Sequence, residues 1–120
     1  RLAGKVVALE EDPGLARQAK ESLAAVGAVQ VDVVTGPLTA GWPAGAPYDV
    51  ILLNGAAEIL PEALGGQLKP GGRLVGVYGC PPAAKATINH VIEGHLVGRP
   101  IFDATALLLP GFAAPPAFVF

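Results

Sequence analysis

Apolar residues of this chain follow strand-like and helix-like patterns. The continuous β-branched run Val6–Leu9 predicts one strand, and the alternation of valines with Gln30 and Asp32 over Val29–Thr35 predicts a second. Between them, apolar residues recur at helical spacing: Leu15, Ala19, Leu23 and Val26. Asp12-Pro13 is typical of a helix start, and Gly27 is typical of the left-handed residue that ends a helix.

A second strand–helix–strand unit follows a loop over Gly36–Pro47 that is rich in glycine, proline and alanine. We predict strands over Tyr48–Asn54 and Arg73–Tyr78. A short helix over Glu58–Leu68 and a turn over Lys69–Gly72 are expected to connect them. Repeated strand–helix–strand units favour right-handed crossovers and therefore a parallel sheet.

The last part of the chain is expected to form an antiparallel hairpin. Two β-rich runs, Ala86–Ile92 and His95–Phe102, are separated only by Glu93-Gly94, which favours a tight turn. Pro100 indicates an edge strand or a strand end. The tail Leu107–Phe120 is apolar but interrupted by prolines, which excludes a regular helix.

Composition limits the class of protein. The 120 residues suit one domain, residues 1–120, and 52% apolar against 15% charged residues suits a buried sheet. A net charge of −2 with scattered basic residues argues against nucleic acid. No apolar stretch approaches the roughly 18 residues of a membrane span. The single cysteine, Cys80, is consistent with a reducing cytoplasm.

The acidic pair Glu10–Glu11 is the clearest candidate for chemistry. A carboxylate at the carboxyl end of a strand holds a ribose in nucleotide-binding α/β folds, and a glycine-rich loop normally precedes it by about 20 residues. Only nine residues precede Glu10, and the chain begins with Arg1. We therefore expect the later part of a cofactor-binding domain, without its first strand and glycine-rich loop.

Several segments, in this order and spacing, carry a resemblance to one family. They are Val7–Pro13, Gly41-Trp42-Pro43, Ala46–Ile51, Leu60–Leu64 and Gln67–Val75. The parallel order ending in a hairpin resembles the class I S-adenosylmethionine-dependent methyltransferases. Within that class, the segments resemble the protein-L-isoaspartate O-methyltransferase family.

This resemblance implies methyl transfer from S-adenosylmethionine to the carboxylate of L-isoaspartyl residues in damaged proteins, a repair reaction. The implied partner is a protein or peptide containing isoaspartate, and the implied location is the cytoplasm. No catalytic side chain is assigned, because an ionised carboxylate is already a nucleophile. The family's substrate-binding part and glycine-rich loop would lie before this chain, so the 120 residues alone are expected to bind the cofactor weakly or not at all.

The resemblance also assigns cofactor-binding residues. Glu10 matches the acid that accepts hydrogen bonds from the ribose hydroxyls, and Glu11 would lie beside the adenine. The alternative for this acidic cluster is capping of the following helix, which Asp12 alone can do. Gly36-Pro37 stands where the family usually has Gly-Asp; Pro37 offers no side-chain hydrogen bond, which leaves apolar contact and backbone groups such as those of Leu38.

Asn54-Gly55, at the expected end of the third strand, would lie near the methionine part of the cofactor or begin a turn. The remaining candidates favour structural roles. His90 and His95 lack further ligands at metal spacing, so no metal is expected. Cys80 has no local base, and Trp42 is expected to anchor its loop.

Two rival functions remain open. One is a degenerate or truncated methyltransferase-like module that acts only by association, through open sheet edges or the apolar tail. The other is half of a dinucleotide-binding oxidoreductase, which the terminal hairpin argues against. In the methyltransferase order the absent strand lies between the strands ending at Glu10 and Asn54. We expect this gap to be closed by direct pairing of those strands, by a neighbouring molecule, or by residues upstream.

Overall fold

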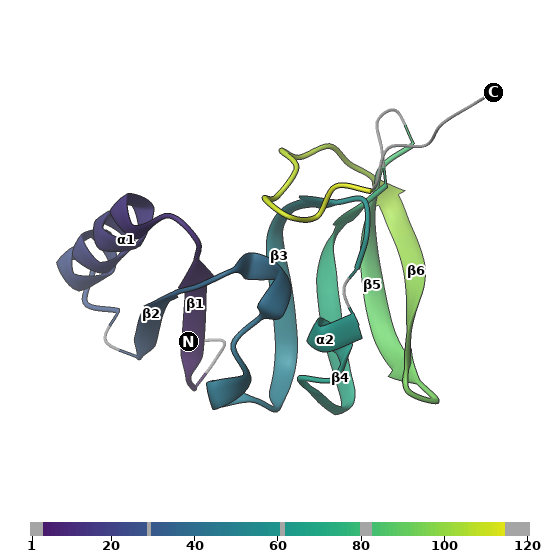
Figure 1. Cartoon of the computed structure of the whole chain (residues 1–120), viewed down its shortest axis with the longest axis horizontal. Coiled ribbons are helices and arrows are strands. Elements are labelled where there is room, and N and C mark those ends of the chain that lie inside the picture. Colours follow the sequence, from purple (N-terminus) through teal and green to yellow (C-terminus); the bar gives the residue numbers. More distant parts are fainter. Residues whose placement is uncertain (1–3, 29, 61, 80–82, 115–120) are drawn as a thin grey trace.

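The computed structural model describes residues 4–28, 30–60, 62–79 and 83–114 and arranges them in two sheets (Figure 1). A two-stranded sheet has the order β1-β2, and a four-stranded sheet has the order β3-β4-β5-β6. The elements are β1 (Val6–Glu10), α1 (Pro13–Ala25), β2 (Val31–Thr35), η1 (Leu38–Ala40), η2 (Pro43–Gly45), β3 (Tyr48–Ala57), α2 (Glu62–Gly65), β4 (Leu68–Tyr78), β5 (Lys85–Ile92) and β6 (His95–Asp103).

The first unit confirms the predicted strand–helix–strand pattern, because β1 and β2 pair in parallel across α1. Asp12 is the N-cap of α1, and its carboxylate accepts hydrogen bonds from the amides of Gly14 (2.8 Å) and Leu15 (3.4 Å). Gly27 has a φ of 72°, and the following amide of Ala28 donates to the Leu23 carbonyl at 2.9 Å. This is the expected left-handed stop. The predicted second strand begins later, at Val31, and Val29 lies outside the described residues.

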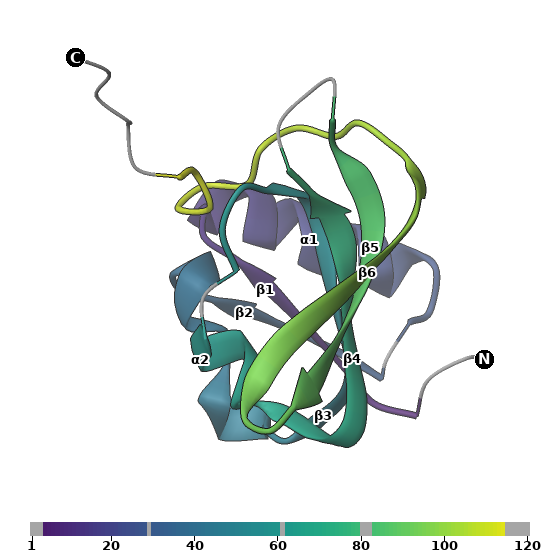
Figure 2. The ribbon, with the colours of Figure 1, turned by 90° about the vertical axis from the view of Figure 1, so that its right-hand side faces the viewer.

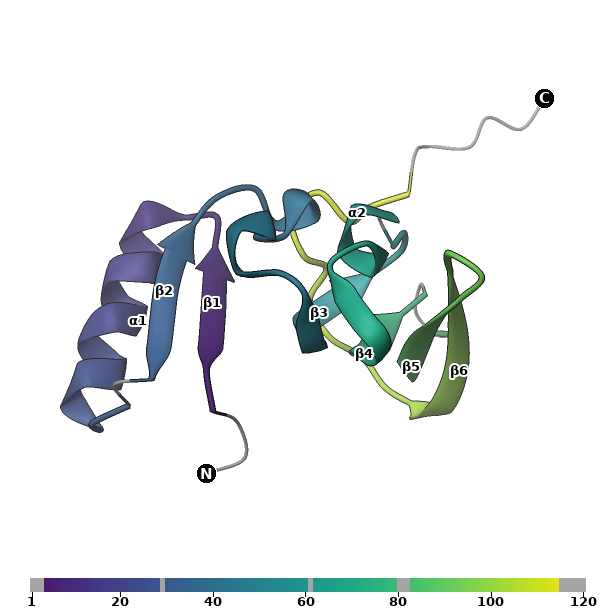
Figure 3. The same cartoon turned by 90° about the horizontal axis from the view of Figure 1, so that it is seen from below.

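The predicted apolar face of α1 is only partly the face that packs. Ala16 is buried at 3% exposure, whereas Leu15 and Val26 are 51% and 77% exposed. The half-buried Ala19 and Leu23 lie between these two exposed ends of the helically spaced set. Figure 3 shows that, in the described part of the chain, β1 and β2 are the only strands beside α1.

The helix expected over Glu58–Leu68 is wrong in length, because α2 covers only Glu62–Gly65. Gly65 and Gly66 end it, and each glycine in a helix costs about 1 kcal/mol relative to alanine. The chain then enters β4 at Leu68, five residues earlier than the predicted Arg73.

The turn expected at Lys69–Gly72 is also corrected, since these residues lie within β4. The register shifts there, from Tyr48 opposite Leu68 to Val50 opposite Arg73. Gly71 has a φ of 80°, and an added Cβ on Gly72 would lie 2.9–3.1 Å from three backbone oxygens. The glycines thus allow an irregular stretch inside a strand where a free turn was expected.

Strand β3 runs on to Ala57, past the predicted end at Asn54. A register shift lies between Leu52 and Ala56, so Asn54 and Gly55 form an irregularity within the strand. The strand continues because Ala56 is paired on both sides, with Val77 of β4 and with Leu108 of the tail.

The hairpin of β5 and β6 is antiparallel as predicted, and β6 is the edge strand (Figure 2). Glu93 and Gly94 have φ values of 51° and 80°, which suits a tight two-residue turn. Pro100 lies where the register shifts between Ala86 and Thr87 of β5. A bulge on an edge strand is a place where a proline is tolerated.

The tail is not helical in its described part, residues 107–114, as predicted, but it packs back on the chain. The amide of Ala56 donates to the Leu107 carbonyl (2.8 Å), and the amide of Leu109 donates to the Ala56 carbonyl (2.9 Å). Phe112 is fully buried in the core of the four-stranded sheet. That core also contains Ala57, Leu64, Leu68 and Leu74.

Within the described residues no ladder joins β1 to β3, so direct pairing, the first of the three expected ways of closing this gap, does not occur. The loop from Gly36 to Pro47, with η1 and η2, separates the sheets instead. At its carboxyl end, the free edge of β3 is instead covered by the tail at Ala56. The other two ways of closing this gap, a neighbouring molecule or upstream residues, stay predictions.

Candidate functional site

The carboxyl ends of β1 and β2 bring together predicted site residues from two parts of the chain. Glu10 pairs with Thr35 in the parallel ladder, and the amide of Gly36 donates to the Glu10 carbonyl at 3.1 Å. Glu11 follows directly and is exposed. The carboxyl ends of parallel strands are where ligands bind in open α/β sheets.

The Glu10 side chain is partly accessible at this edge. Its Oε1 accepts one hydrogen bond, from the amide of Asp12 at 3.1 Å. No other hydrogen bond to this carboxylate is found among the described residues. Because Asp12 caps the helix, Glu10 is not needed for that task. An acceptor-only group with spare lone pairs suits a ligand that presents hydroxyl donors, such as a ribose.

Pro37 and Leu38 continue from this edge into η1, but they face different surroundings. Pro37 is exposed, and its carbonyl accepts from the amide of Ala40 at 3.2 Å. The Leu38 side chain packs against the core of the four-stranded sheet. The Leu38 carbonyl accepts from the amide of Gly41 at 3.2 Å, so both its side chain and its carbonyl have contacts within the chain.

Asn54 and Gly55 are not joined to the Glu10 edge by any strand ladder, although β1 and β3 point the same way in Figure 1. Asn54 is exposed. Gly55 is approached by the tail: an added Cβ would lie 2.7 Å from Leu109 side-chain atoms and 2.9 Å from the Leu107 carbonyl oxygen. The glycine is thus required for tail packing, and its role toward a cofactor stays a prediction.

Gln67 and Tyr48 hold the loop beside this edge, and neither role was predicted from the sequence. Gln67 is 7% exposed and bonds to the loop at Ala40 and Trp42, while the Tyr48 hydroxyl donates to the Trp42 carbonyl at 2.5 Å. Trp42 is therefore a loop anchor, as predicted. The sequence does contain one signal for Gln67, which is a lone side-chain amide between the apolar residues Leu64 and Leu68. Its partners could not be predicted, because they lie 25 and 27 residues away in the chain.

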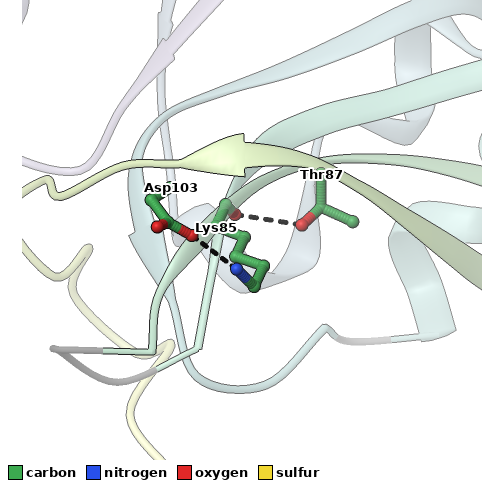
Figure 4. Close-up of polar contacts among 3 residues, drawn as sticks. All are labelled: Lys85, Thr87 and Asp103. Atoms are coloured by element: carbon green, nitrogen blue, oxygen red, sulfur yellow. Dashed lines mark hydrogen bonds and ion pairs between the residues drawn. The ribbon is translucent and has the colours of Figure 1, made fainter.

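Two surface hollows lie away from the predicted site residues. One, of about 690 Å³, follows β2 and is lined by Val33 and Trp42 among others. The second, of about 620 Å³, lies on the hairpin and includes Lys85 and Thr87. There, Lys85 pairs with Asp103 across the base of the hairpin (Figure 4), and this ion pair lowers the pKa of Asp103. The Thr87 hydroxyl donates to the Lys85 carbonyl at 3.0 Å.

Two further findings concern the residues that the structure describes. No group of three histidine, cysteine or acidic side chains there is placed to hold a metal ion. No helix in that part of the chain is long and apolar enough to cross a membrane. Cys80 lies outside the described residues, so its predicted inert role has no structural test.

Solved structures with this arrangement define the class. A protein-L-isoaspartate O-methyltransferase matches 89% of this chain with a TM-score of 0.80 and 27% identity. A second, described as a protein-L-isoaspartate O-methyltransferase from Plasmodium falciparum in complex with S-adenosyl-L-homocysteine, has a TM-score of 0.72 over 88% of the chain. Its identity of 17% supports the fold alone. The parallel strands and terminal hairpin are those of a class I methyltransferase.

The family follows from the sequence comparison. The family model for protein-L-isoaspartate(D-aspartate) O-methyltransferase matches residues 1–81, and the chain belongs to that family. A relative from Methanoregula boonei is 49% identical over 75 residues, which cover 62% of this chain and 35% of the relative. One from Methylorubrum extorquens is 44% identical over 94 residues, or 78% of this chain and 40% of the relative. The chain thus spans about two fifths or less of the length of these two relatives.

Proposed function

We propose that this chain is the cofactor-side portion of an enzyme that methylates the carboxylate of L-isoaspartyl residues in damaged proteins, with S-adenosylmethionine as methyl donor. The observation that carries the proposal is the family match over residues 1–81, which includes the whole Glu10 edge. Its proposed partner is a protein or peptide containing isoaspartate, and the proposed location is the cytoplasm.

The residues at the Glu10 edge fit this cofactor. Glu10 is proposed to accept hydrogen bonds from the ribose hydroxyls, because one of its oxygens has no hydrogen bond among the described residues. Glu11, Gly36, Pro37 and the Leu38 backbone are proposed to surround the adenine. Asn54 and Gly55 are proposed to lie toward the methionine part, on the far side of the gap between the sheets.

The chemistry asks little of the protein's own side chains. When bound, S-adenosylmethionine supplies a methyl group activated by a sulfonium. The isoaspartyl carboxylate is ionised at neutral pH, because its pKa lies near 4, so no general base is needed. The contribution of this chain is to hold the donor at a fixed edge of a rigid sheet so that the acceptor meets it in line.

The test compares the 120-residue chain with a chimera. In the chimera, this chain replaces the matching stretch of the Methanoregula boonei relative and everything that follows it. We expect the chimera to bind S-adenosylhomocysteine with micromolar affinity by titration calorimetry and to label an isoaspartyl peptide from radioactive S-adenosylmethionine. The chain alone should bind at least 100-fold more weakly. Micromolar binding by the chain alone would contradict the expectation that an upstream glycine-rich loop is required.

The role of Glu10 is tested in the same chimera. Glu10→Ala should weaken binding by roughly 1.5–3 kcal/mol, the scale of hydrogen bonds to a charged group, which is about 10- to 150-fold in Kd. Glu21→Ala, an exposed acid on α1, is the matched control and should change Kd less than twofold. A chimera that folds but neither binds nor transfers would favour the rival function, an association module without catalysis.

A further inference from the structure

Gln67 is a buried side-chain amide whose two polar atoms both reach the same loop. Its Oε1 accepts from the amide of Trp42 at 3.0 Å, and its Nε2 donates to the Ala40 carbonyl at 2.9 Å. At 7% exposure, the side chain is nearly shielded from water. A buried amide with both ends bonded to backbone holds that backbone in one geometry, because either broken bond leaves an unpaired polar group.

The loop is shaped to receive this amide. Gly41, between the two bonded residues, has a φ of 62°, in the left-handed region that favours glycine. An added Cβ there would lie 2.5 Å from Oε1 and 2.8 Å from Nε2 of Gln67. The Gln67 amide therefore lies directly against the bare α-carbon of Gly41.

From this contact a continuous path leads to the edge that carries Glu10. The Tyr48 hydroxyl holds the carbonyl of Trp42 while Gln67 holds its amide. The Trp42 ring lies beside Gly36, 3.7 Å from where a Cβ on Gly36 would be. The amide of Gly36 in turn donates to the Glu10 carbonyl. Gln67, which directly precedes β4, thus links the four-stranded sheet to the carboxyl ends of β1 and β2.

We propose that Gln67 is a positioning residue, which sets the geometry of residues 36–42 and thereby the adenine side of the cofactor site. Its effect on loop geometry stands on the contacts alone, and its effect on cofactor affinity rests on the proposed function. Gln67 touches no reacting group; it acts through Trp42 and Gly36.

The first experiment uses the full 120-residue chain without ligand. Trp42 is the only tryptophan, so its fluorescence reports this loop. In Gln67→Leu we expect red-shifted emission, at least twofold stronger quenching by acrylamide, and shifts of the Gly36 and Glu10 amide signals in ¹⁵N NMR spectra. Asn89→Leu is the matched control, because Asn89 is also a buried amide, 3% exposed, and donates to a backbone carbonyl, that of Leu74 (3.3 Å). It should leave these signals unchanged.

A conservative variant separates positioning from simple loss of stability. Gln67→Glu keeps an acceptor for the Trp42 amide, but when ionised it cannot donate to the Ala40 carbonyl. Protonated glutamate has both a donor and an acceptor, and burial raises its pKa. We therefore expect the Trp42 signal of Gln67→Glu to be disturbed at about pH 8 and to return to that of the wild type at about pH 5. Gln67→Leu should show no such recovery.

The second experiment measures S-adenosylhomocysteine binding by the chimera. Gln67→Leu should raise the Kd of the chimera about tenfold. Asn89→Leu, at a similar loss of stability, should keep a Kd near the wild-type value. If wild-type chimera binds nothing, the proposed function fails while the fluorescence and NMR results still decide the positioning role. Unchanged Gly36 and Glu10 signals in Gln67→Leu would overturn the positioning role whatever the chimera does.

Discussion

The smaller sheet of this molecule has the more apolar strands, yet only the larger sheet encloses a core. All five residues of β1 are half-buried and none is buried. In the four-stranded sheet, by contrast, Ala57, Leu74 and Phe112 are completely shielded. The difference lies in what covers each sheet: one helix lies on β1 and β2, whereas α2, η1 and the tail all pack on the larger sheet (Figure 1).

This comparison shows that an apolar run predicts a strand, whereas the elements packed around that strand decide whether it is buried. Even the larger sheet is covered on one face only. Val50 and Leu52 of β3 are 46% and 69% exposed, and Phe102 of β6 is 62% exposed. Apolar strands of this kind are typical of sheets covered on both faces. A homo-oligomer formed through the open sheet edges or the apolar tail stays a prediction from the sequence. The tail is less available for it, because Phe112 is buried within the chain.

The largest expected effect comes from removing the centre of the better-packed region. Phe112→Ala should reduce the free energy of unfolding by about 3–5 kcal/mol, because it empties a fully enclosed site. Urea unfolding followed by circular dichroism measures this loss. Leu107→Ala, in the same tail but at 90% exposure, should change stability by no more than about 0.5 kcal/mol. Equal effects of the two variants would mean that the tail does not pack on the core.

Gly41→Ala tests the contact that joins the two regions. At its φ of 62° and ψ of −152°, a backbone region used almost only by glycine, any Cβ costs about 1–3 kcal/mol, and displacing Gln67 adds a penalty of about 1–3 kcal/mol. Gly94→Ala is the control for a Cβ at positive φ, since its φ is 80° and nothing lies within 4 Å of an added Cβ. In a Gln67→Ala background the difference between these variants should shrink by the part that comes from displacing Gln67. An unchanged difference would place all of the strain in the loop backbone.

Asp12→Ala should reduce the stability of the β1–α1–β2 region alone. Loss of an N-cap costs about 0.5–2 kcal/mol, and Asp12 supplies the cap of α1 with bonds to Gly14 and Leu15. We expect faster hydrogen exchange throughout α1 and unchanged exchange in β4 and β5. Glu11→Ala is the control, because Glu11 is exposed and makes no cap. Equal acceleration in both sheets would show that the two regions unfold as one unit.

The smallest effect concerns the exposed base of the hairpin. Hydrogen bonding and attraction from Lys85 lower the pKa of Asp103. A carboxylate whose pKa is lowered in the folded state stabilises that state at pH values above the usual pKa of the group. This contribution disappears as the pH falls through the lowered pKa. In Lys85→Met the pKa of Asp103 should return to its usual range, and an NMR titration of the carboxyl signals measures this. Lys69→Met, which removes the pair with Asp49, should leave it unchanged.

Features that depend on near neighbours in the chain were determined by the sequence itself. The Asp12 cap, the Gly27 stop, the Glu93-Gly94 turn and the parallel pairing of β1 with β2 were all predicted correctly. The family resemblance assigned Glu10 and Gly36 to one site, and they lie together because the carboxyl ends of the adjacent parallel strands β1 and β2 meet. Backbone preferences and hydrophobic period act over a few residues, so a single sequence displays them directly.

Only the tertiary structure decided the features that join distant residues. Strand β4 began at Leu68 by pairing with Tyr48, Gln67 found partners in the loop before β3, and the tail met Ala56. The separation of β1 from β3 likewise depends on what lies between them. Local patterns do not contain these outcomes, because each is a choice among distant partners made by shape, burial and the pairing of polar groups.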